Sequence, residues 1–117
     1  MKFEDIYQFF YNPPPTYLNR ELAVCYILDA LLEEDSYGLA LIVQLSEQFP
    51  QYRLSDTVLC RSLKFLEESG LIRWYWYKGK GRGRPRKMYK VIPEKKAQAQ
   101  ELANFWRNYS LGKGSHY

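Results

Sequence analysis

The chain has 117 residues, of which 46% are hydrophobic, and a formal net charge of +4. This length accommodates one compact domain with short extensions, and this apolar content excludes an intrinsically disordered chain. The sequence has neither an apolar run of the roughly 20 residues that a membrane span needs nor cysteines spaced as in a metal site. We therefore expect a cytoplasmic protein with reduced thiols that needs no metal or cofactor.

Residues 1–15 are expected to form an N-terminal arm. Phe3, Ile6 and Phe10 recur at helical spacing, which predicts a short helix over residues 3–11 with an apolar stripe for another surface. Three consecutive prolines at 13–15 prevent that helix from continuing. A partner subunit is one candidate for the surface that the stripe covers.

Residues 16–92 are expected to form the main domain, which begins with two helices. Residues 18–32 are apolar on nearly all sides, a pattern typical of a buried central helix. A second helix is expected to begin after Ser36, a good N-cap residue, and to end before Pro50.

A third helix is the best marked of the chain. Ser55 is suited to cap its start, and Gly70 offers the left-handed conformation that follows many helix ends. On a helical wheel the apolar residues, with Phe65 among them, gather on one side. The opposite side carries Thr57, Arg61 and Lys64.

Two strands and a final helix are expected next. Residues 71–77 and 88–92 are rich in aromatic and branched residues, which predicts a β-hairpin whose tip alternates glycine with cations. A final helix is expected over residues 93–110, with an apolar stripe too large to leave in water, and residues 111–117 are expected to form a flexible tail. The predicted fold is therefore α+β, mostly α, in the order of a winged helix-turn-helix.

The third helix is the candidate for DNA recognition, because the major groove admits one α-helix and its N-terminal residues approach the bases. Arg61 is suited to a bidentate pair with guanine, Thr57 to a thymine methyl group or a phosphate, and Lys64 to a phosphate. The competing interpretation is an ordinary solvated helix face. The candidate residues of this region are Tyr52, Arg53, Ser55, Thr57, Arg61 and Lys64.

The glycine-rich segment between the strands is the candidate wing. No acidic residue occurs from residue 73 to residue 92, and residues 82–85 have the form of an AT-hook, which fits the minor groove of A·T-rich DNA. Alternating glycines also let the backbone approach phosphates closely. The competing interpretation is a solvated basic loop. The candidate cations are Lys78, Lys80, Arg82, Arg84, Arg86 and Lys87.

Two other binding functions remain open as alternatives, whereas the sequence does not support catalysis. The aromatic residues 74–77 are suited to stacking on unpaired bases, as in an RNA or single-stranded-DNA binding module. A basic wing is also suited to an acidic protein partner. We assign no catalytic residue, because the sequence lacks a P-loop, a metal-ligand cluster and a histidine in the folded region for a triad.

Three motifs in order resemble the PadR-like transcriptional regulators: residues 35–38, residues 63–72 and residues 83–89. The resemblance covers residues 21–109 and implies a homodimer that binds double-stranded operator DNA, usually as a repressor. It also implies dimer contacts from the C-terminal helix. The matching positions are Leu102, Phe105, Trp106 and Tyr109, to which the arm would add Phe3, Ile6 and Phe10.

The sequence departs from the family pattern at two places. Cys60 stands where the family commonly has Tyr, and Arg61 or Ser62 stands where it has Pro nearby. The family's contacts with DNA bases therefore do not carry over directly to these positions. The final helix is shorter than in many members, which leaves room for the arm to complete the dimer. No feature of the sequence supports a small-molecule effector.

Residues 12–25 carry a finer resemblance, to the cyanobacterial circadian period-extender group of this family. That resemblance implies a clock gene promoter as the target.

Overall fold

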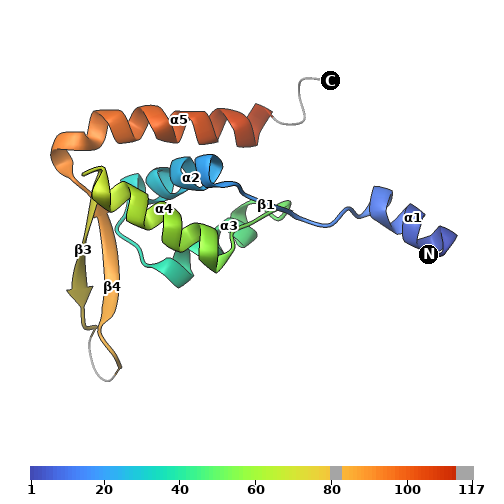
Figure 1. Cartoon of the computed structure of the whole chain (residues 1–117), viewed down its shortest axis with the longest axis horizontal. Helices are drawn as coiled ribbons and strands as arrows, with labels where there is room; N and C mark the ends of the chain where they lie inside the picture. Colours follow the sequence, from blue (N-terminus) through green and yellow to red (C-terminus); the bar gives the residue numbers. More distant parts are fainter. Residues whose placement is uncertain (80–82, 113–117) are drawn as a thin grey trace.

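The computed structural model describes residues 1–79 and 83–112. The predicted winged helix-turn-helix order is confirmed, with a short strand pair in addition (Figure 1). No helix within the described ranges is long and apolar enough to cross a membrane. The elements are α1 (Phe3–Tyr11), β1 (Thr16–Tyr17), α2 (Arg20–Glu33), α3 (Gly38–Gln48), β2 (Tyr52–Arg53), α4 (Asp56–Glu68), β3 (Ile72–Tyr77), β4 (Arg86–Val91), the 3-10 turn η1 (Pro93–Lys95) and α5 (Lys96–Gly112).

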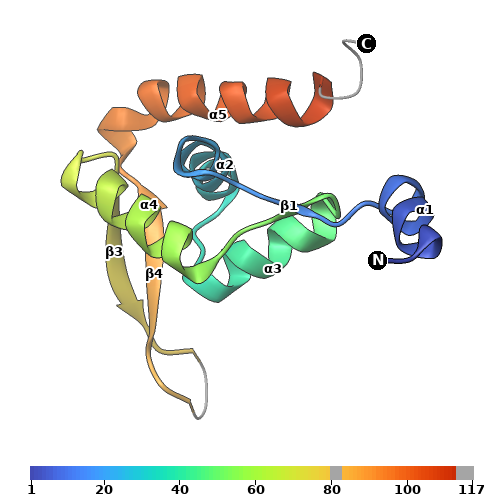
Figure 2. The same cartoon turned by 45° about the vertical axis from the view of Figure 1, so that its right-hand side comes forward.

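Helix α2 is the centre of the molecule, as its apolar sequence predicts. Asn19 caps its start, since its side-chain oxygen accepts a hydrogen bond from the Leu22 amide at 2.8 Å. Helix α5 lies along one side of α2, and α3 and α4 lie on the other (Figures 1 and 2). This position between helices explains why α2 needs apolar residues around most of its circumference.

An aromatic cluster joins α5 to the rest of the domain. The Trp106 ring lies 5.6 Å from Tyr26, 5.2 Å from Phe49 and 5.5 Å from Tyr52, in each case edge to face. Trp106 is 0% exposed. Its assignment to a dimer interface is therefore wrong, because its side chain is buried within a single chain.

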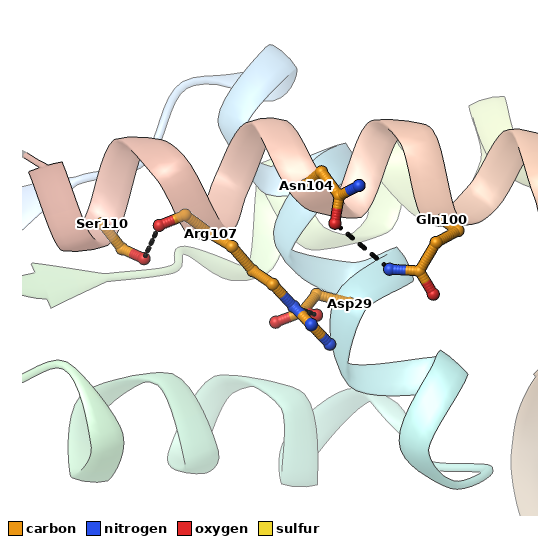
Figure 3. Close-up of polar contacts among 5 residues, drawn as sticks. All are labelled: Asp29, Gln100, Asn104, Arg107 and Ser110. Atoms are coloured by element: carbon orange, nitrogen blue, oxygen red, sulfur yellow. Dashed lines mark hydrogen bonds and ion pairs between the residues drawn. The ribbon is translucent and has the colours of Figure 1, made fainter.

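A polar contact supports the same junction. Arg107 Nε donates to Asp29 Oδ1 of α2 at 2.6 Å (Figure 3). The Tyr26 hydroxyl donates to the Leu41 carbonyl of α3 at 2.6 Å, and burial raises the pKa of this hydroxyl well above its usual value. Residues of α2 thus form hydrogen bonds with α5 on one side and with α3 on the other.

A short parallel strand pair, which the sequence did not predict, anchors the start of the domain. Thr16 pairs with Tyr52 and Tyr17 with Arg53. The Thr16 amide donates to Gln51 at 2.8 Å, and the Leu18 amide donates to Arg53 at 2.9 Å. Strands this short leave no periodic pattern to detect.

The N-terminal arm forms the predicted helix α1, which stands away from the rest of the molecule in both views (Figures 1 and 2). None of its residues is buried. The predicted apolar stripe therefore exists, and in the single chain it faces solvent.

We predict that Trp106→Ala lowers the free energy of unfolding by about 3–5 kcal/mol, because it empties a large buried site. Urea unfolding of the purified protein measures this loss. Trp76→Ala is the matched control: Trp76 is 62% exposed, and we expect a loss of about 1 kcal/mol or less. Equal losses for the two variants would contradict the central role of Trp106.

Candidate nucleic-acid interface

Helix α4 has the caps that its sequence predicts. The Ser55 hydroxyl accepts a hydrogen bond from the Val58 amide at 3.2 Å. Gly70, at φ +77°, follows the helix in the left-handed region that favours glycine. These local signals fix where the helix begins and ends.

The predicted polar face of α4 is exposed. Thr57, Arg61 and Lys64 follow one another at intervals of four and three residues, so they lie on one side of the helix, and all three are exposed. The side that packs on the domain consists of Leu59, Ser62, Leu63 and Leu66.

Phe65 differs from its prediction. It was expected on the packed side, but its side chain is 48% exposed at the edge of the helix. There it lines a groove with residues of α2 and α5. A helical wheel could not show this. It gives the direction of each side chain around the helix axis, but not how much of the helix surface the neighbouring elements cover.

The two residues predicted to contact DNA from before α4 have other partners. Tyr52 is 1% exposed, and its ring packs on Trp106, so its predicted contact with the DNA backbone is wrong. Arg53 is half-buried, and its guanidinium donates to the carbonyls of Pro50 and Tyr52 at 2.7 and 2.8 Å. The candidate DNA-contacting residues of this region that remain are those from Ser55 onward.

Strands β3 and β4 form the predicted hairpin, with a register from Ile72 opposite Val91 to Tyr77 opposite Arg86. Towards the tip, Lys78 and Arg84 are exposed. Gly83 has φ +132°, a conformation that other residues rarely adopt. The predicted cations Lys80 and Arg82 lie outside the described residues.

The hairpin is clamped onto the turn between α2 and α3. Ser36 and Tyr89 exchange backbone hydrogen bonds at 2.7 and 3.2 Å. The Tyr75 hydroxyl donates to Asp35 at 2.7 Å, which raises the pKa of that hydroxyl. Ser36 is therefore not the N-cap of α3, because it is buried in this bridge, and Tyr37 occupies the cap position instead.

Arg86 and Lys87, two of the predicted wing cations, lie over aromatic rings. The Arg86 guanidinium is 4.0 Å from the centre of the Tyr37 ring, and the Lys87 ammonium is 4.5 Å from that of Trp74. The first of these cation–π contacts ties β4 to the turn before α3, and the second holds Lys87 against its own hairpin. Sequence reasoning missed residues 35–37 as the support of the wing, although it had singled them out as a motif.

The Trp74 and Trp76 rings lie on one face of β3, as strand alternation predicts. They pack edge to face at 5.4 Å, and both are partly exposed. The neighbouring Tyr89 is buried, which raises the pKa of its hydroxyl against the opposing effect of Lys87. The aromatic strand is thus partly covered by its own neighbours.

The sequence and the fold agree on the relatives of this chain. The family described as transcriptional regulator PadR-like matches residues 27–101, which is more than half of the chain. The chain belongs to this family. It is therefore a transcriptional regulator with the winged-helix order of elements, in which α4 is the candidate recognition helix and the β3–β4 hairpin the candidate wing.

Solved structures of other proteins are similar over most of the chain. The circadian clock associated protein Pex from Anabaena is 57% identical, with a TM-score of 0.89, and the alignment covers 98% of this chain and 100% of that one. Pex from Synechococcus is 54% identical over 93% and 97% of the two chains, with a TM-score of 0.89. A PadR family transcription regulator from Clostridium difficile is 26% identical over 74% and 86%, with a TM-score of 0.60. The comparison with curated proteins gave no match.

Proposed function

We propose that this PadR-like regulator binds double-stranded operator DNA in the cytoplasm as a homodimer and acts as a repressor. The observation that carries the proposal is the exposed face of α4, with Thr57, Arg61 and Lys64, beside a cationic hairpin that the α2–α3 turn holds in place. Arg61 would read a base edge in the major groove, and Lys64 would contact a phosphate.

The wing would contribute most of the electrostatic attraction. Lys78 and Arg84 are exposed near its tip, and Arg86 and Lys87 follow on β4. Each phosphate that a cation neutralises releases counterions, so affinity depends on the number of such contacts and falls with salt. Such contacts act with little regard to sequence, so base selection would depend on Arg61 and Thr57.

We predict that Arg84→Ala makes duplex binding weaker and less dependent on salt. The log–log slope of affinity against salt concentration should fall in magnitude by about 0.9, as expected for one lost phosphate contact. Fluorescence anisotropy of a labelled duplex over a range of salt concentrations measures this slope. Lys95→Ala is the control, since Lys95 is an exposed cation in η1, at the end of β4 opposite the wing tip, and its loss should leave the slope unchanged.

The same assay tests the alternative, an RNA or single-stranded-DNA binder that uses residues 74–77. If single strands displace the duplex at equal salt, and Trp76→Ala abolishes binding while Arg84→Ala does not, the duplex proposal is wrong. The packing of Trp74 on Trp76, with Lys87 over the Trp74 ring, favours duplex binding, because these contacts already occupy part of the aromatic surface.

The dimer surface that we propose lies on α5. Phe105 is 59% exposed there, and Leu102, one turn earlier, is half-buried, whereas Tyr109 packs on Trp106. A large exposed aromatic beside another apolar residue is typical of an interface. In a two-fold dimer the recognition helices would enter successive major grooves, about 34–36 Å apart.

We predict that Phe105→Asp converts the dimer to monomer at micromolar concentration, because it places a charge in the proposed apolar contact. Analytical ultracentrifugation measures the change. Asn104→Asp adds the same charge at the neighbouring exposed position and should leave the dimer intact. A wild-type protein that sediments as a monomer would remove the dimer from the proposal.

We also propose that the target genes belong to a circadian clock. Support comes from the 57% identity to the Anabaena protein, which is described as circadian clock associated. Genome-wide mapping of the bound DNA tests this, and bound sites confined to genes unrelated to the clock would contradict it.

A further inference from the structure

A groove of about 580 Å³ opens between α2, α4 and α5. Its volume lies within the range of about 300–1,000 Å³ that is usual for binding sites and is sufficient for a few apolar side chains. Apolar side chains line its interior, and one positively charged and one negatively charged side chain lie among them. The lining residues are Arg20, Glu21, Val24, Cys25, Phe65 and Leu102.

Helix α1 complements this groove, because it presents an apolar surface that nothing in the described chain covers. Phe3, Tyr7 and Phe10 are between 60% and 79% exposed and lie on one stripe with Ile6. The helix has nine residues, fewer than the roughly 12–15 that an isolated helix needs in water. A helix so short and so apolar requires a surface to pack on.

We propose that the groove of one copy receives α1 of a second copy. The proposal deepens the homodimer of the proposed function and rests on it. By two-fold symmetry each arm would enter the groove of its partner, so the dimer would contain two identical arm contacts in addition to those of Phe105.

Charge supports this fit. The first turn of α1 carries Glu4 and Asp5, and Lys2 precedes it. Arg20 and Glu21 provide the opposite charges in the groove. Apolar side chains from the α1 stripe would then lie on Val24, Phe65 and Leu102.

The linker favours a partner over the arm's own groove. Hydrogen bonds from Thr16 and Leu18 fix the chain at β1, and residues 13–15 are prolines, which hold an extended backbone with a rise of about 3.1 Å per residue. The arm therefore leaves the domain along a stiff segment, and both views show it pointing away from the other helices (Figures 1 and 2).

Disulfide trapping tests the proposal with the full chain, because Cys25 already lines the groove. One tagged chain carries Cys60→Ser, so that Cys25 is its only cysteine. A second, differently tagged chain carries Cys25→Ala, Cys60→Ser and either Ile6→Cys or Phe10→Cys. Burial raises the pKa of the Cys25 thiol, so the mixed chains are incubated at alkaline pH to supply thiolate, with dissolved oxygen and a copper catalyst as the oxidant.

We expect a disulfide between the two different chains when the new cysteine is on the stripe. The matched control is Gln8→Cys on the opposite side of α1, which should cross-link several times more slowly. Deletion of residues 1–11 should also raise the dimer dissociation constant about tenfold or more, because it removes several buried aromatic side chains.

The other outcomes overturn the inference in distinguishable ways. Equal cross-linking at stripe and control positions, or a dimer whose stability does not change on arm deletion, would show that the arm does not dock in the groove while the dimer stands. A disulfide formed within one chain that carries Cys25 and Phe10→Cys would show that the arm docks in its own groove. A wild-type protein that is monomeric throughout would remove the dimer as well.

Discussion

The rest of the structure depends on the packing of Trp106 among the aromatic rings of its own chain. Tyr26 reaches Trp106 from α2, Phe49 from the end of α3, and Tyr52 from β2, so one side chain of α5 holds three separate segments. The Asp29–Arg107 ion pair lies in the neighbouring turn and is partly exposed, so its contribution is small beside that of the buried rings. Because α5 is part of the core, a surface on it keeps a fixed position relative to the recognition helix.

Local signals predicted most of the elements. Ser55 and Gly70 mark the start and the end of α4. These ends were predictable because a cap and a left-handed glycine act through the nearest few residues. Long-range packing was not predictable in the same way. Trp106, Tyr52 and Phe65 were placed on the wrong surfaces because the path of α5 across α2 decides which aromatic residues are enclosed, and no spacing along the sequence encodes that path.

In the candidate site too, local features were predictable from the sequence and long-range contacts were not. Periodicity placed Thr57, Arg61 and Lys64 on an exposed face, and composition identified the hairpin as cationic. The support of the hairpin joins residues 35–37 to residues that lie 40–53 positions later, and only the fold brings them together. In the sequence those residues marked the start of a helix; in the structure they position the wing.

This clamp has a consequence for the DNA. A hairpin tied by Ser36, Asp35 and Tyr37 has little freedom to swing, so the spacing between wing and recognition helix is set before binding. In the proposed complex, adjustment at the interface would then fall to the duplex, which would bend or change its groove width to meet both elements. The free energy of this deformation depends on the DNA sequence. Pyrimidine–purine steps bend easily, whereas A·T tracts are stiff and already have a narrow minor groove. A rigid protein of this kind would distinguish DNA sequences through their stiffness, including base pairs that no side chain touches.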